Sequence, residues 1–245
     1  MQMMRPLPRA ILFDMDDTIL AVSGSARVVW TRIAEEFAAA LAPLSPAEIV
    51  TAIEIQSQRL WSDTAWNREW RVRVAEARRH VVASAFALLR AAEKTVPAPV
   101  VGDLMADRFT LNRDNELSVF PGAHETLDHL KRLGVRLALI TNGAAEPQRA
   151  KVIRFALAER FDHVQIEGEH GFGKPEERAY RHAMGALGVG PRETWMVGDN
   201  LEWEIVAPQR LGIYAIWYDG YSVGLPPDCP VRPDRIIRSL PELLS

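Results

Sequence analysis

Acidic residues crowd the end of a hydrophobic segment near the start of the chain. The apolar run Ala10–Phe13 is followed by Asp14, Asp16 and Asp17. In an extended backbone successive side chains alternate in direction, so Asp14 and Asp16 should share one side while Asp17 points away. Like charges this close repel one another unless a cation neutralises them. The pattern favours a divalent cation or reaction chemistry over its structural alternative, an acidic turn that caps the next helix.

Polar residues gather at three later places as well. These clusters are Thr141-Asn142-Gly143, Gly173-Lys174-Pro175 and Gly198-Asp199. Each has an ordinary explanation: a strand-to-helix turn, a surface lysine whose proline opens the following helix, and an acidic loop. In an open parallel sheet, ligands bind beyond the carboxyl ends of the strands, so the joint placement of the clusters predicts one binding site.

Short apolar runs alternate with amphipathic stretches in the second half of the chain. Helices are expected over 123–133 and 176–187, each closed by a glycine. This alternation is typical of βαβ units, so we predict a parallel sheet. The strands expected in it are Ala10–Phe13, 135–140, 164–166, 194–197 and 213–217.

The stretch 23–112 has a different pattern. Val29, Ile33 and Phe37 recur every four residues, as one stripe of a helix does, and similar stripes follow later in the stretch. We therefore expect an all-helical domain at 23–112, inserted after the first strand, and a core built from 1–22 and 113–245.

Taken in order, the four polar clusters resemble the motifs of the haloacid dehalogenase (HAD) superfamily, in its aspartyl-nucleophile phosphatase branch. The helical insert resembles the cap that such proteins carry between the nucleophile loop and the second strand. The resemblance implies an α/β fold, a doubly wound parallel-sheet, Rossmann-like core with an all-helical cap domain.

The same resemblance implies roles for individual residues. Asp14 would be the nucleophile and Asp16 the general acid and base. Thr141 and Lys174 would hold the transferring phosphoryl group, and the Asn142 amide beside Thr141 is suited to the same anionic oxygens.

The implied cofactor is Mg²⁺, which prefers oxygen ligands. Its ligands would be the side chains of Asp14 and Asp199 and the backbone carbonyl of Asp16. Glu204 stands where the family more often has Asp, and its longer side chain should reach the site as an outer residue through water or Lys174. Glu202 is a lesser candidate for that role.

These residues favour an enzyme, a magnesium-dependent phosphatase that hydrolyses a small phosphorylated metabolite through an aspartyl-phosphate. A phosphomutase would share every motif. A 2-haloacid dehalogenase of the same fold is disfavoured, because a halide leaving group needs no proton from Asp16. A non-catalytic protein that binds a phosphorylated ligand is the remaining alternative.

Composition and charge indicate which kinds of partner and which cellular location to expect. The formal net charge of the 245 residues is -3, so no basic surface indicates nucleic-acid binding. No apolar stretch approaches the roughly 20 residues that would span a bilayer, and the first residues lack the pattern of a secretory signal. Cys229 is the only cysteine, which excludes an intramolecular disulfide. A cytoplasmic protein with a small-molecule substrate is expected, and its oligomeric state is left open.

Overall fold

The computed structural model describes residues 6–245, and residues 1–5 of the core predicted at 1–22 and 113–245 lie outside the described part. The chain divides into two compact units. The core unit comprises the residues up to Ala21 together with Ser118–Ser245, and the helical unit comprises Val22–Leu117.

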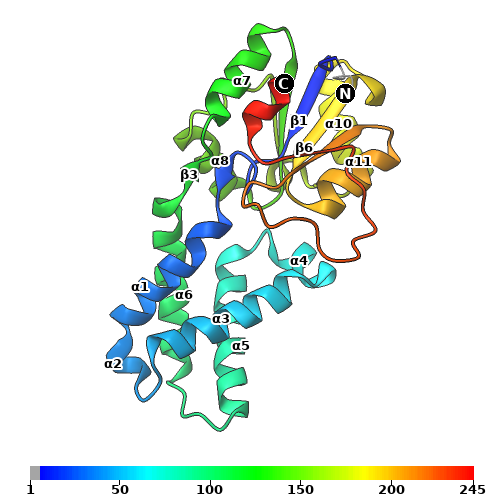
Figure 1. The fold of residues 1–245 in the computed structure, drawn as a ribbon. Helices are drawn as coiled ribbons and strands as arrows, with labels where there is room; N and C mark the ends of the chain where they lie inside the picture. The colour runs from blue at the N-terminus through cyan, green and yellow to red at the C-terminus, as the bar shows by residue number, and fades with distance from the viewer. Residues whose placement is uncertain (1–5) are drawn as a thin grey trace. The chain divides into compact units, whose positions relative to one another are not determined.

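The core unit is built around a six-stranded sheet in the order β5-β4-β1-β6-β7-β8, in which every neighbouring pair is parallel (Figure 1). This arrangement confirms the predicted α/β class. Each of the five predicted strands is present. The strands are β1 (Ala10–Phe13), β4 (Arg136–Thr141), β5 (His163–Ile166), β6 (Thr194–Gly198), β7 (Tyr214–Tyr218) and β8 (Arg235–Ile237).

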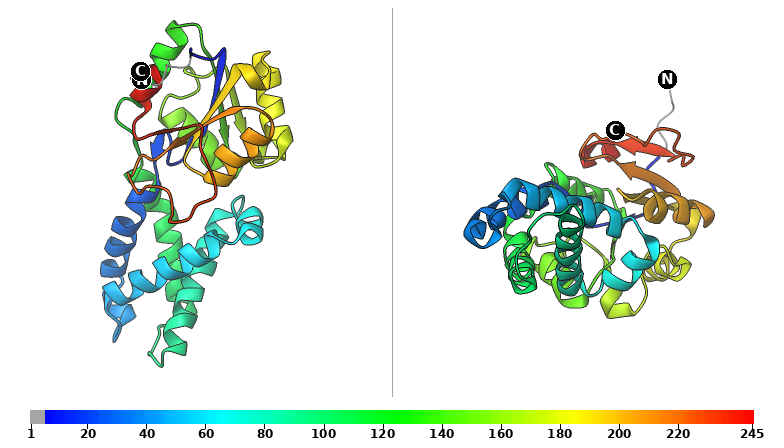
Figure 2. Two further views of the ribbon diagram at one scale, coloured as in Figure 1. Left: turned by 45° about the vertical axis from the view of Figure 1, so that its right-hand side comes forward. Right: turned by 90° about the horizontal axis from the view of Figure 1, so that it is seen from below.

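Helices cover both faces of this sheet (Figures 1 and 2). One buried cluster joins Leu12 of β1 and Ile140 of β4 to Tyr180 of α10, so α10 packs on one face. Parallel strands are joined by right-handed crossovers, so the helices before and after β4 lie on the opposite face and the sheet is doubly wound. The helices are α7 (Ala123–Arg132), α8 (Ala145–Arg154), α9 (Glu167–His170), α10 (Glu177–Leu187) and α11 (Ala207–Arg210). Shorter or wider turns are the 3₁₀ segments η3 (Pro191–Glu193) and η5 (Leu240–Leu244) and the π-helix η4 (Leu201–Val206).

Three strands were not predicted. Strand β2 (Leu20–Ala21) pairs antiparallel with β3 (Ser118–Val119), which ties together the two points where the chain leaves and re-enters the core unit. Two-residue strands are too short to show a period in the sequence. Strand β8 is at the edge of the sheet, and its Ile236 is exposed, so it lacks the continuous apolar pattern of the inner strands.

The helical unit consists of helices packed around one apolar core. Trp30 stacks on Phe109 with ring centroids 4.0 Å apart. Ser45 and Glu48 form a capping box at the start of the third helix. The helices are α1 (Ala26–Glu36), α2 (Ala38–Leu41), α3 (Pro46–Trp61), α4 (Thr64–Trp70), α5 (Val74–Ala91) and α6 (Pro99–Arg113), with 3₁₀ turns η1 (Ser23–Ser25) and η2 (Asp114–Glu116).

Within the described residues, every helix is too short or too polar to cross a lipid bilayer.

Candidate active site

The register of the sheet brings the sequence clusters together. Phe13, the last residue of β1, is level with Leu139 of β4 and with Val197 of β6. Asp14 therefore leaves the sheet between the ends of these two strands, one of which continues into Thr141 and the other into Gly198-Asp199. The carboxyl ends of three adjacent strands thus carry polar side chains into one region.

Lys174 is the centre of the charge arrangement. Its side chain is 1% exposed, and its Nζ lies 2.5 Å from Asp14 Oδ1 and 2.7 Å from Glu204 Oε1. Burial alone would lower the pKa of Lys174, but the attraction of Asp14 and Glu204 outweighs burial and raises it. The ammonium group therefore stays charged and holds two carboxylates that come from β1 and from η4.

Asn142 positions this lysine. Its Nδ2 donates to the Lys174 carbonyl oxygen at 2.7 Å, and its Oδ1 accepts from the Lys174 backbone N–H at 2.9 Å. A Cβ on Gly173 would lie 2.5 Å from Asn142 Oδ1, so only glycine fits there. Pro175 was expected in the first turn of the next helix, and this was wrong: α10 begins at Glu177, and the residues before it form a turn that carries Lys174 to the site.

Thr18 lies between two acidic residues. Its hydroxyl donates to Asp14 Oδ2 at 3.1 Å and lies 3.4 Å from Asp199 Oδ1. One hydroxyl proton serves one acceptor at a time, so the Asp14–Asp199 pair is only partly satisfied by Thr18. Trp217 Nε1 fixes the backbone at Asp199 by donating to its carbonyl oxygen at 2.7 Å.

Asp16 is held by helix α8. Lys151 Nζ lies 2.9 and 2.7 Å from its two carboxylate oxygens, and Gln148 Nε2 donates to Asp16 Oδ2 at 3.1 Å. Gln148 also donates to Thr141 Oγ1 at 2.6 Å. Sequence reasoning missed Lys151 and Gln148. Their three-residue spacing puts them on one face of a helix, but only the buried state of both side chains reveals their role.

Glu204 reaches the site because η4 is wider than an α-helix and Gly198 leaves room. A Cβ on Gly198 would lie 2.1 Å from Glu204 Cγ. The second carboxylate oxygen of Glu204 accepts from the Asn200 backbone N–H at 2.7 Å. The structure thus brings Glu204 directly to Lys174 rather than through water. Glu202 is not brought to the site: it is exposed and lies 3.8 Å from Arg210.

The site has an excess of negative charge. Burial raises the pKa of Asp14 despite the opposing charge of Lys174. Burial, together with Asp14 and Glu204, raises the pKa of Asp199 well above its usual range, and burial raises that of Glu204 to about 7. Four carboxylates of the site, Asp17 not counted, have two ammonium groups as counter-charges. The carboxylates are those of Asp14, Asp16, Asp199 and Glu204, and the ammonium groups are those of Lys151 and Lys174.

A divalent cation fits this donor set. Two uncompensated negative charges match the charge of Mg²⁺, and carboxylate and carbonyl oxygens are the ligands it accepts. The buried Asp14 carboxylate and the half-buried Asp199 carboxylate, which share the one Thr18 hydroxyl, are the groups that such an ion would neutralise. Lys174 and Glu204 already satisfy one another, so they are outside this donor pair.

The chain is similar to proteins of one known family. Residues 8–212 match the haloacid dehalogenase-like hydrolase family. The chain belongs to this family. Among curated haloacid dehalogenase-like relatives, it is 37% identical over 154 residues to the phosphoserine phosphatase of Thermus thermophilus, covering 62% of this chain and 60% of the relative. It is 34% identical over 126 residues to the glyceraldehyde 3-phosphate phosphatase of Pyrococcus furiosus, covering 51% and 52%. The chain thus spans only about half to three fifths of the length of these relatives.

Solved structures extend the likeness to nearly the whole chain. Bacillus subtilis YfnB, solved bound to magnesium, superposes with a TM-score of 0.71 at 23% identity over 97% of both chains, which shows a shared fold. The 2-haloacid dehalogenase of Pseudomonas syringae superposes with a TM-score of 0.59 at 27% identity, over 97% of this chain and 98% of that one. The haloacid dehalogenase-like architecture therefore includes the helical unit as well as the core unit.

Proposed function

We propose that this protein is a magnesium-dependent phosphatase that hydrolyses a small phosphorylated metabolite through an aspartyl-phosphate on Asp14. The observation that carries the proposal is the buried Lys174 ammonium between Asp14 and Glu204, with Asp199 beside them. The names of the matched relatives, phosphoserine phosphatase and glyceraldehyde 3-phosphate phosphatase, support the substrate class.

Mg²⁺ would be held by the Asp14 and Asp199 side chains and the Asp16 carbonyl, and when bound it would shield the negative charge of the carboxylates from that of the phosphate. Asp14 attacks phosphorus with a carboxylate oxygen, and the bond from phosphorus to the leaving oxygen breaks. Thr141, Asn142 and Lys174 hold the phosphoryl oxygens. Since Asn142 also binds the Lys174 backbone, it positions the lysine while it contributes to the anion site.

Asp16 moves protons in both halves of the reaction. It donates a proton to the departing alkoxide and then accepts one from the water that attacks phosphorus and frees Asp14 as a carboxylate. Lys151 Nζ, 2.7 Å from Asp16 Oδ2, orients the carboxylate that exchanges these protons.

Phosphate release from a panel of phosphomonoesters tests the proposal. The panel includes phosphoserine, triose phosphates, sugar phosphates and nucleotides, each with Mg²⁺ and with EDTA. We expect Mg²⁺-dependent release that Asp14→Asn abolishes. Asp16→Ala should lower kcat by about 10²–10⁴-fold, the usual contribution of a positioned proton donor. Glu159→Gln, an exposed change elsewhere on the core unit, serves as the control that keeps full activity.

The same variants separate the alternatives. A dehalogenase would release halide from a 2-haloacid, and that reaction would survive Asp16→Ala because halide leaves without a proton. A phosphomutase would return an isomeric sugar phosphate in place of inorganic phosphate. Absence of turnover across the whole panel, in a preparation that binds phosphate, would contradict catalysis and leave a protein that only binds phosphorylated ligands.

A further inference from the structure

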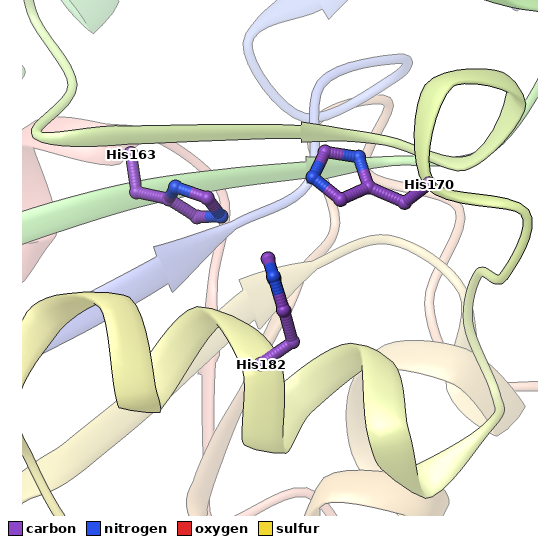
Figure 3. A group of neighbouring side chains, drawn as sticks. All are labelled: His163, His170 and His182. Carbon is purple, nitrogen blue, oxygen red and sulfur yellow. The ribbon is translucent and has the colours of Figure 1, made fainter.

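Three histidines outside the candidate active site face one another. They are His163 on β5, His170 at the end of α9 and His182 on α10. One ring nitrogen of each lies within 4.8 Å of those of the other two. Figure 3 shows the three imidazoles, from three different elements, directed into a common space.

Hydrogen bonds fix two of these rings in the form that can bind a metal. His170 Nδ1 lies 3.1 Å from the Ile166 carbonyl oxygen, and His182 Nδ1 lies 2.8 Å from Gln165 Oε1. Both oxygens only accept, so in the neutral imidazole each Nδ1 carries the proton and each Nε2 has the lone pair that can bind a metal. An oxygen acceptor behind each metal-binding imidazole is the usual arrangement around protein-bound metals.

The Gln165 side chain, which accepts the hydrogen bond from His182, is itself held in place. Gln165 is buried, and its Nε2 donates to the Ala179 carbonyl oxygen at 3.1 Å, which turns its Oε1 toward His182. The third ring offers a second kind of observation: His163 Nε2 is buried and has no hydrogen-bond partner within the described residues. A buried polar atom without a partner costs free energy, so it points to a ligand that would satisfy it.

We propose that His163, His170 and His182 form a site for a transition-metal ion of the Zn²⁺ class, separate from the active site. Imidazole nitrogen suits Zn²⁺, Ni²⁺, Cu²⁺ and Co²⁺, whereas Mg²⁺ takes oxygen. With Zn–N bonds of about 2.0–2.1 Å, tetrahedral ligand atoms stand roughly 3.4 Å apart, so small side-chain rotations would close the set around the ion. His182 is exposed, which gives the ion a path from solvent.

The site would join three consecutive elements of the core unit. His170 and His182 flank the segment that carries Gly173, Lys174 and Pro175, so a bound metal would cross-link the two ends of the lysine turn. An ion that binds only the folded protein stabilises it by mass action. At a free Zn²⁺ concentration about 100-fold above its Kd, the thermal midpoint of the core unit should rise by about 5–10 °C.

A cluster of aromatic rings in edge-to-face contact is the competing explanation. Phe172 lies with its ring centroid 5.8 Å from His170 and 5.5 Å from His182, and Arg178 covers its face at 4.7 Å. Edge-to-face packing accounts for the closeness of the rings. It does not account for the unpartnered His163 Nε2 or for the outward acceptors that leave two Nε2 atoms free.

Calorimetry on the full chain tests the site. Zn²⁺ is titrated in the presence of excess Mg²⁺, and Co²⁺ is added in parallel, because its visible absorption reports a low-coordinate nitrogen site. We expect one ion per chain. His182→Ala, at an exposed position, should weaken binding at least about tenfold and abolish the Co²⁺ spectrum, because removal of a ligand outweighs the 10–100-fold effect of an outer-shell partner.

Two controls separate this site from other metal binding. His129→Ala, on α7 and outside the cluster, should bind like the parent. Asp14→Asn should also keep the ion, which makes the result independent of the proposed phosphatase function. The proposal is overturned if Zn²⁺ does not bind, if binding survives His182→Ala unchanged, or if His129→Ala or Asp14→Asn removes it.

Discussion

Replacement of Lys174 by Met tests the charge arrangement at the centre of the core unit. The lysine side chain is 1% exposed and pairs with both Asp14 and Glu204. Removal of one partner of a buried ion pair costs about 3–5 kcal/mol, because the other charge is left uncompensated. Lys174→Met leaves two carboxylates in that state, so we expect the free energy of unfolding of the core unit to fall by about 5 kcal/mol, the upper end of that range.

This loss should depend on pH through Glu204. Burial raises the pKa of Glu204 from 4.5 to about 7 in the folded protein, although Lys174 opposes the shift. Between these values the folded state binds more protons than the unfolded state, so stability falls as the pH rises through the window. Without the Lys174 ammonium the folded pKa rises further. The variant should therefore be closest to the parent below pH 4.5 and furthest from it above pH 7.

Urea unfolding in EDTA at about pH 5 and about pH 8, followed by hydrogen exchange of the β1 and β6 peptides, measures this loss in the core unit. Lys174→Met/Glu204→Gln is the matched control. It also removes one of the two uncompensated carboxylates, so it should recover at least about 1 kcal/mol of the lost free energy of unfolding at the higher pH. A single variant within about 1 kcal/mol of the parent at the higher pH, or a double variant no more stable than the single one, would refute the reasoning.

Three smaller changes test other contacts. Gly198→Ala should cost about 1–3 kcal/mol of core stability in urea unfolding, because its Cβ would lie 2.1 Å from Glu204 Cγ, and Gly198→Ala/Glu204→Ala should recover part of it. Lys151→Met should lower kcat more than it raises KM for the phosphomonoester, since Asp16 loses the ammonium group 2.7 Å away; an unchanged kcat would contradict a role for that contact. Ser45→Ala should reduce the stability of the helical unit by about 1 kcal/mol, measured by hydrogen exchange of α3, with no effect on exchange in β1.

The sequence predicted the elements with strong patterns. In a chain of βαβ units, the short and fully buried run Ala10–Phe13 predicts a strand, and it forms β1. Gly188 ends α10 as predicted. Helix α4 could not be separated from its neighbours, because Trp61, Trp66 and Trp70 are half-buried and give no clear stripe.

The sequence predicted Asp14, Asp199 and Lys174 as site residues, but not Lys151 and Gln148, the two groups that hold Asp16. Asp14, Asp199 and Lys174 lie together because strand order brings them together, and strand order follows from the βαβ pattern. In the sequence alone, Lys151 and Gln148 do not differ from other polar residues of an amphipathic helix. Their contacts with Asp16 depend on how α8 is rotated on the sheet, and hydrophobic periodicity does not determine that rotation to within one residue.

The position of β1 explains why its aspartate is central to the site. β1 pairs with β4 on one side and β6 on the other, so the residue after Phe13 has the polar ends of two strands as neighbours. Asn142, after β4, accepts a hydrogen bond from the backbone N–H of Lys174 at that edge of the sheet. Glu204, in η4 after β6, pairs with the ammonium group of the same lysine. A strand at the edge of the sheet would have one such neighbour, and its carboxylate would lie partly in solvent. The central strand therefore gives Asp14 both its burial and its counter-charges, which is what a buried carboxylate needs if it is to remain available for chemistry.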